Sequence, residues 1–210
     1  MLSNYYTVKK EDFDQTIIQK SRFIGYVKRV ETEEEAQAFI QKIKKKHHDA
    51  THNCSAYMVG EHNQFQKAND DGEPSGTAGV PILEVLKKQE LKDTAVVVTR
   101  YFGGIKLGAG GLIRAYSSTT SQALQTAGVV QRRLMKGFSV VVDYALLGKL
   151  ENALRNAEYV LDSINYLDKV TFIVYVPDGE EHVFHDWLVD LTHAQAAFSD
   201  KGTAYVEIDV

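Results

Sequence analysis

Cysteine, proline and tryptophan are scarce in this chain of 210 residues, which has one, three and one of them. The single cysteine, Cys54, excludes an internal disulfide. No apolar run is long enough to span a membrane, and the first residues lack a signal-peptide pattern. These absences predict a globular, cytoplasmic protein with no membrane association.

Positive charge is concentrated in the first two thirds of the chain. Residues 1–136 carry 20 Lys/Arg against 15 Asp/Glu, whereas residues 137–210 carry 4 against 13. We therefore expect two domains, 1–136 and 137–210. The mildly basic first domain is compatible with nucleic acid, and the acidic second domain argues against its own contact with phosphate.

Glycine is dense in one stretch only. Three consecutive valines, Val96 to Val98, predict a strand buried on both faces. Apolar residues recur at helical spacing after Gly111 and stop at Gly128. Between them, five glycines within nine residues indicate positive φ angles or a close approach to the backbone: Gly103, Gly104, Gly108, Gly110 and Gly111.

A glycine-rich loop that leads into a helix presents unpaired N–H groups and the positive end of the helix dipole, so it favours bound anions. Arg100, Lys106 and Arg114 add cationic side chains around this point. The spacing matches neither a P-loop nor a dinucleotide fingerprint. The sequence predicts an anion site or a close backbone contact, with a purely structural glycine turn as the alternative.

Three carboxylates, Asp70, Asp71 and Glu73, crowd into four residues of a turn-forming segment. They could coordinate a hard cation or pair with cations of the glycine loop, and Arg100 and Lys106 are the countercharges expected for Asp71 and Glu73. A solvated turn is the plainer interpretation.

In a third interpretation, Ser75 or Thr77 caps a helix over residues 78–88, so part of this acidic loop is structural.

Another helix is predicted to begin with a capping box of Thr32 and Glu35 and to end at a run of lysines. In residues 138–209 the hydrophobic patterns predict the order βαββαβ, a ferredoxin-like unit.

A histidine-rich segment raises the question of a metal. His47 and His48 are adjacent and the chain has no second cysteine, so we expect no metal site. His52 and Cys54 share one face if this segment is a strand. A buried thiol beside a hydrogen-bonded histidine is favoured over a nucleophile pair, and both residues are kept as second-tier site candidates.

Four motifs carry a family resemblance: KSRF (20–23), ATHNCSAY (50–57), DDGEPSGTAG (70–79) and VVVTRYFGGIKLGAGGLIRAYS (96–117). They resemble bacterial members of the IMPACT/YigZ family. The resemblance implies an α+β fold with two domains. The first would be like domain 2 of ribosomal small-subunit protein five, a β-sheet with helices on one face. The second would be ferredoxin-like, resembling domain V of elongation factor G.

The resemblance also implies a role in translation. We expect a non-enzymatic, translation-associated binding protein that contacts RNA, the ribosome or a protein partner of translational control, with no cofactor. The alternatives are a phosphate-handling enzyme with a glycine loop like that of GHMP kinases, and a pure protein-interaction module. The expected binding surface, with Asp71 and Glu73 opposite it, is Arg100, Tyr101, Gly103, Gly104, Lys106, Gly108, Gly110, Gly111 and Arg114.

Overall fold

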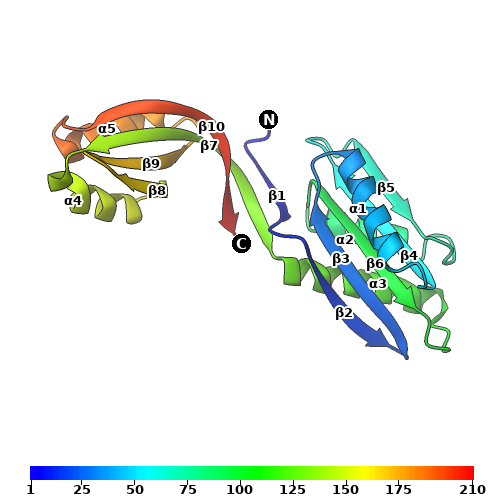
Figure 1. The fold of residues 1–210 in the computed structure, drawn as a ribbon. Helices are drawn as coiled ribbons and strands as arrows, with labels where there is room; N and C mark the ends of the chain where they lie inside the picture. The colour runs from blue at the N-terminus through cyan, green and yellow to red at the C-terminus, as the bar shows by residue number, and fades with distance from the viewer. The chain divides into compact units, whose positions relative to one another are not determined.

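The computed structural model describes residues 1–210 and divides them into two compact units, which consist mainly of Tyr5–Gln131 and Arg132–Ile208. Each unit combines a β-sheet with helices, which confirms the α+β class (Figure 1). The division falls inside one long strand, β7 (Val129–Val142), and lies before residue 136, where we placed the boundary. None of the helices is long and apolar enough to cross a membrane.

The N-terminal unit is built on an antiparallel five-stranded sheet. Its strands, in spatial order, are β2 (Asp12–Ile18), β3 (Ser21–Arg29), β6 (Thr94–Tyr101), β4 (His52–Val59) and β5 (Phe65–Asn69). The valine run forms the central strand, β6, as predicted. Because all but its last residue are buried, this strand fixes the position of the glycine-rich loop that follows it.

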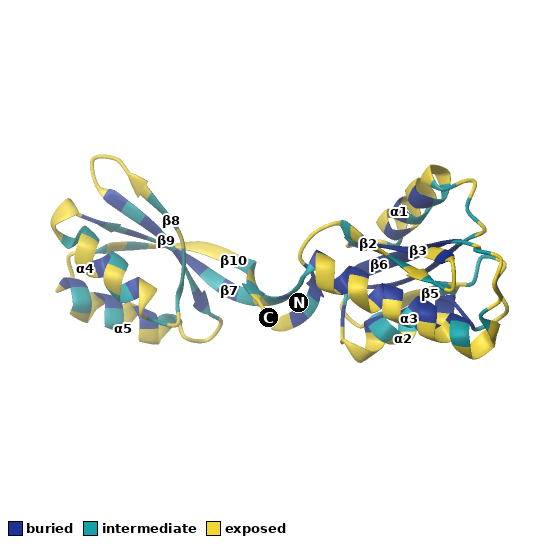
Figure 2. Ribbon diagram, turned by 90° about the horizontal axis from the view of Figure 1, so that it is seen from below, coloured by how far each residue is buried: buried dark blue, intermediate teal, exposed yellow.

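Helices cover both faces of this sheet. Val96 and Val98 pack beneath α2 (Gly79–Lys88) and α3 (Gly108–Ala127). On the other face, alternate β6 residues pack with the buried stripe of α1 (Glu33–Lys46) (Figure 2). The expectation of helices on one face only was therefore wrong for α1. A central strand that is apolar on both faces has to be covered twice.

The predicted start of α1 is confirmed. The hydroxyl of Thr32 accepts a hydrogen bond from the backbone N–H of Glu35 at 3.2 Å, and the Glu35 carboxylate accepts one from the N–H of Glu31 at 2.8 Å. The first contact satisfies a donor that a helix start leaves unpaired, and the second fixes the residue before the N-cap to the first turn.

Asp70, rather than Ser75 or Thr77, holds the start of α2. Its carboxylate accepts hydrogen bonds from the N–H groups of Gly76, Ala78 and Gly79 at 2.8, 3.0 and 2.8 Å. Burial opposes ionisation, but these three N–H groups outweigh it and lower the pKa of Asp70. The cap comes from outside the helix, so local spacing could not indicate it.

The C-terminal unit has the predicted ferredoxin-like order. Strands β10, β7, β9 and β8 lie side by side in that order, and β1 (Asn4–Val8) also pairs with β7. Valine and leucine make up most of the core, and Phe172 and Phe184 are fully buried in it. The remaining elements are α4 (Tyr144–Arg155), β8 (Val160–Tyr166), β9 (Val170–Pro177), α5 (Glu181–Thr192) and β10 (Ala197–Asp209).

Candidate functional site

A pocket of about 400 Å³ lies in the N-terminal unit, where the end of β6, the acidic loop and the start of α3 meet. Its walls mix charged, aromatic and aliphatic side chains. The lining residues are Thr51, His52, Glu73, Pro74, Arg100, Phe102, Lys106, Leu107, Gly108, Ala109 and Leu112. The pocket therefore unites residues from three of the four motifs.

A buried ion pair forms one wall of the pocket. The Arg100 Nη1 donates to Glu73 Oε1 at 2.7 Å, and the two side chains are only 6% and 3% exposed. Arg100 Nη2 lies 3.4 Å from Ser21 Oγ, and the guanidinium carbon is 5.3 Å from the Phe23 and Phe102 ring centroids. The Arg100 Nε–H has no hydrogen-bond partner. The expected pairing of Arg100 with Glu73 is present, but it is a buried link rather than an open surface.

Two buried side chains support this ion pair from behind. The Tyr116 hydroxyl donates to Glu73 Oε1 at 2.8 Å, and Cys54 Sγ lies 3.3 Å from the Tyr116 oxygen. The Cys54 thiol donates to the carbonyl oxygen of Asp70 at 3.0 Å. Burial, followed by the neighbouring thiol and carboxylate, raises the pKa of Tyr116. The phenol therefore stays protonated and remains a donor to Glu73.

His52 reaches the same pocket from β4. Its Nδ1 lies 2.8 Å from the carbonyl oxygen of Asp71, which can only accept, so Nδ1 carries a proton. Nε2 is left to face the pocket, 3.8 Å from Glu73 Oε2. The second-tier candidates His52 and Cys54 do not contact each other as a nucleophile pair, because Cys54 is bonded to Asp70 and Tyr116 and His52 to Asp71.

The start of α3 forms the opposite wall. The helix begins at Gly108, earlier than the predicted start after Gly111, so Gly108, Gly110 and Gly111 belong to its first turn. No side chain caps this end, and the first turn contains no acidic residue. The free N–H groups and the positive end of the dipole lie beside Lys106, an arrangement that favours an anion.

Tyr101, which we expected in the binding surface, lies away from the pocket, and the neighbouring Phe102 lines it. Phe102 lines the pocket and is 46% exposed. Tyr101 packs with the α1-side cluster, where its hydroxyl donates to Asp49 at 3.0 Å and lies 2.9 Å from His47 Nδ1. Neighbouring strand residues point to opposite faces, and Tyr101 is the last residue of β6.

Asp71 pairs with α1, not with the glycine loop. Its Oδ1 lies 2.5 Å from Lys44 Nζ, and its Oδ2 accepts from the backbone N–H of Asn53 at 2.7 Å. The predicted pairing with Arg100 or Lys106 is absent. Asp71 therefore links the acidic loop to α1 and to the start of β4.

Comparisons with known proteins agree with the motifs. Residues 19–124 match the model of the Impact N-terminal domain, and residues 140–195 match a domain of unknown function, DUF1949. The IMPACT family member YvyE of Bacillus subtilis (strain 168) is 55% identical over 207 residues, which cover 99% of this chain and 95% of YvyE. The chain belongs to the IMPACT family.

Other IMPACT proteins match in part or in whole. YigZ of Escherichia coli (strain K12) is 36% identical over 151 residues, covering 68% of this chain and 74% of YigZ. A protein IMPACT homolog of Saccharomyces cerevisiae is 31% identical over 113 residues, covering 51% and 43%. A crystal structure of a hypothetical protein shares the fold, with a TM-score of 0.61, 29% identity and coverage of 94% and 97%. None of these names states an enzymatic activity.

Arg114 and four of the five loop glycines, Gly103, Gly104, Gly110 and Gly111, do not line the pocket. Arg114 lines a different hollow on α3, together with Lys88 and Ile113. The N–H of Gly103 donates to Ser21 Oγ at 3.1 Å, and Gly104 lies in the loop before α3 at a φ of +86°.

Sequence reasoning missed the supporting residues Ser21, Tyr116 and Leu112, although all three lie within or next to quoted motifs. A tyrosine at a buried position of a helix, as Tyr116 is, needs a polar partner for its hydroxyl, and that need is the signal that could have indicated it.

We expect Cys54 to be unreactive in the native IMPACT chain. Burial, assisted by the charges of Glu73, Asp71 and Asp70, raises the pKa of Cys54 to about 12, so the thiol is protonated at neutral pH. Alkylation by iodoacetamide, measured by mass spectrometry, should be slow in buffer and fast in denaturant. Equal rates in the two conditions would contradict the assignment of Cys54 to the core.

Proposed function

We propose that this IMPACT family protein is a non-enzymatic, translation-associated binding protein whose N-terminal unit contacts single-stranded RNA at the pocket beside α3. The observation that carries the proposal is the meeting of three features in one pocket. These are the uncapped start of α3, the unpaired cation Lys106 and the half-exposed ring of Phe102.

Each feature suits a different part of a nucleotide. The first-turn N–H groups of α3 and the Lys106 ammonium can contact a phosphate, because both present positive charge to the same space. The Phe102 ring offers a face for base stacking, the interaction by which proteins bind unpaired bases. Glu73 does not repel the phosphate strongly, since Arg100 neutralises it at 2.7 Å.

The pairing of the carboxylates supports binding over phosphoryl transfer. A kinase-like site needs carboxylates that are available to magnesium and to the attacking hydroxyl. Here Asp71 contacts Lys44 and the N–H of Asn53, and Glu73 contacts Arg100 and Tyr116. We therefore favour the hypothesis of a binding protein over that of a phosphate-handling enzyme.

The site can be tested by titrating a fluorescent single-stranded RNA at two salt concentrations, together with ribosome co-sedimentation. Lys106→Ala should weaken RNA binding and flatten the salt dependence by roughly 0.7 of a unit, because one phosphate contact is lost. Ala109→Asp should abolish binding without unfolding, since a carboxylate in the first turn stabilises a helix but repels phosphate from the pocket.

Arg114→Ala is the matched control, because it removes one cation of α3 that lies outside the pocket, whereas Lys106 lines the pocket just before this helix begins. It should bind RNA like the wild type. Equal losses in Arg114→Ala and Lys106→Ala would place the contact elsewhere on α3. If the wild type binds neither RNA nor ribosomes, the proposal fails and a protein partner of translational control becomes the better explanation.

A further inference from the structure

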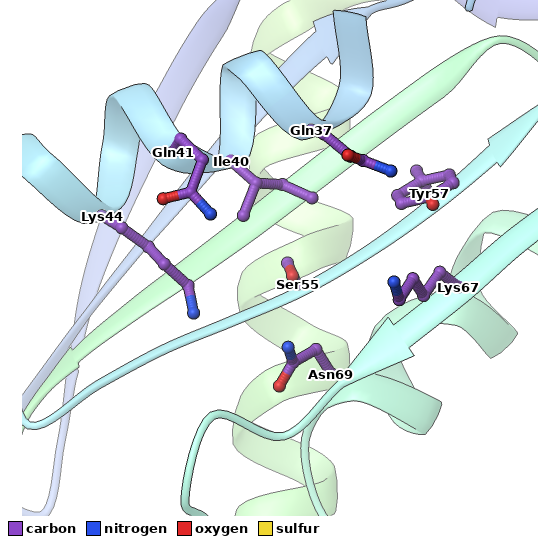
Figure 3. Close-up of a pocket in the computed structure, with 8 residues that line it drawn as sticks. All are labelled: Gln37, Ile40, Gln41, Lys44, Ser55, Tyr57, Lys67 and Asn69. Atoms are coloured by element: carbon purple, nitrogen blue, oxygen red, sulfur yellow. The ribbon is translucent and has the colours of Figure 1, made fainter. Parts of the chain in front are cut away.

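A second pocket lies on the opposite face of the same sheet, between α1 and the β4–β5 hairpin (Figure 3). Its volume is about 200 Å³. It arises because α1 packs over β6 and β4, while the edge strand β5 beyond them keeps most of its residues exposed. This α1 pocket shares no lining residue with the proposed RNA site.

The sequence of α1 is unusual on the side that borders this pocket. Its buried residues are Ala36, Phe39 and Ile43, which pack on the sheet. Directly beside them runs a second stripe at helical spacing that is mostly polar: Gln37, Ile40, Gln41 and Lys44. Gln37 and Gln41 are exposed although they line the pocket, so this stripe borders a hollow that is open to water and not a packed interface.

The floor of the pocket is formed by two cross-strand pairs, Ser55 with Asn69 and Tyr57 with Lys67. Ser55 is 3% exposed and stands between larger residues of the same face, so its small side chain leaves the hollow open. In Figure 3 the side chains of Lys44, from α1, and Lys67, from β5, lie on either side of Ser55. Each wall of the hollow therefore supplies one ammonium group.

The charged groups that line the α1 pocket are two lysines, and the carboxylates of Asp71 and Glu33 contact the lining residues Lys44 and Tyr57. No carboxylate lines the pocket itself. Lys44 is already paired with Asp71 at 2.5 Å, whereas Lys67 forms no ion pair and therefore supplies the uncompensated charge. Three amide side chains and the Ser55 hydroxyl add groups that can both donate and accept hydrogen bonds.

We infer that the α1 pocket binds a small, hydroxyl-bearing phosphate ester of the sugar-phosphate type. Ammonium groups on two sides can contact different oxygens of a tetrahedral phosphate, and the amides can bond to hydroxyl groups of the ligand. The volume lies below the roughly 300–1,000 Å³ typical of drug-sized ligands, so a small metabolite fits and a dinucleotide or peptide does not.

The test is an NMR titration of the full-length, ¹⁵N-labelled protein with ribose 5-phosphate, inorganic phosphate, gluconate and ribose. Ribose 5-phosphate should produce saturable shifts at the amides of Ser55, Lys67 and Asn69, phosphate smaller ones, and ribose none. Shifts as large with gluconate would overturn the assignment to phosphate. Shifts with RNA but with none of the small molecules would overturn a metabolite site.

Two variants and one control test whether the ligand binds in the α1 pocket. Lys67→Met should weaken ribose 5-phosphate binding by about tenfold or more, because a charged hydrogen bond is lost, and should leave the thermal midpoint unchanged. Lys88→Met removes a lysine of α2 that lines another hollow and should bind as the wild type. Ser55→Val fills the hollow with a residue that strands favour, so binding should disappear while the fold persists. Wild-type affinity in Lys67→Met or Ser55→Val would refute the site.

These outcomes are independent of the RNA proposal. Lys67→Met leaves the residues of the α3-side pocket untouched, so RNA binding should be unchanged in this variant. Conversely, Ala109→Asp should bind ribose 5-phosphate normally.

Discussion

Replacing Glu73 with alanine is expected to lower the free energy of unfolding of the N-terminal unit by about 3–5 kcal/mol, the range found when one partner of a buried ion pair is removed. Arg100 would keep a charge at a side chain that is 6% exposed, without its carboxylate. The Tyr116 hydroxyl would also lose its acceptor, which is now 2.8 Å away. Both costs arise from leaving polar groups buried and unpaired.

The measurement is urea unfolding followed in parallel by far-UV circular dichroism and by tryptophan fluorescence. The chain's single tryptophan, Trp187, belongs to the C-terminal unit, where it is partly buried and stacks on Phe184 of the core. We propose that the two units unfold separately. Glu73→Ala should then shift the unfolding transition of the N-terminal unit, seen by circular dichroism, and leave the transition seen by tryptophan fluorescence unchanged. A shift of both transitions together would argue for one cooperative unit.

A double variant serves as the control for charge. Glu73→Met combined with Arg100→Met removes both charges at once, so it should lie closer to the wild type in stability than Glu73→Ala. A loss in the double variant as large as that of Glu73→Ala would attribute the effect to packing. If the free energy of unfolding of Glu73→Ala lies within about 1 kcal/mol of the wild-type value, the ion pair behaves like an exposed one. That result would contradict the buried ion pair.

The parts of this fold that sequence reasoning found are those that depend on local patterns. The valines of β6, the Thr32 cap of α1 and the βαββαβ order of the C-terminal unit each leave a signature within a few consecutive residues. The approach of Glu73 to Arg100 was expected from charge alone, because these were the nearest opposite charges in adjoining motifs.

The parts that were missed depend on distant contacts. Asp71 pairs with Lys44, 27 residues away, and Asp70 caps a helix that starts nine residues later. Neither contact follows from spacing, because each depends on how the acidic loop folds back. The placement of Tyr101 on the α1 face, in contrast, was available from the alternation of strand residues. We overlooked this alternation when we included Tyr101 in the same binding surface as Arg100.

The five glycines of the loop look equivalent in the sequence, but the structure gives them different roles. A Cβ on Gly103 would lie 2.1 Å from the backbone carbon and oxygen of Lys20, a contact that no side-chain rotation relieves. A Cβ on Gly110 would meet nothing closer than Arg114 Nη1 at 3.7 Å. Gly103 is therefore required for packing against the β2–β3 turn, whereas Gly110 is not.

We therefore expect Gly103→Ala and Gly110→Ala to have effects of opposite sign on thermal and urea stability. Gly103→Ala should destabilise the N-terminal unit by at least about 3 kcal/mol, the upper end for overpacking, because backbone has to move away from backbone. Gly110→Ala should be neutral or stabilise it by up to about 1 kcal/mol, since Gly110 lies in the first turn of α3 and alanine loses less backbone entropy there.

Gly103→Ala should also reduce RNA binding by more than its loss of stability accounts for, when binding is measured at a temperature where the variant is still folded. The N–H of Gly103 bonds to Ser21, and the same segment carries Phe102 and Lys106 into the pocket. Displacing Gly103 from Lys20 displaces those side chains with it. If folded Gly103→Ala binds RNA as tightly as the wild type, the loop does not position Phe102 and Lys106 for RNA. If Gly103→Ala is as stable as Gly110→Ala, the close contact between Gly103 and Lys20 does not constrain the loop.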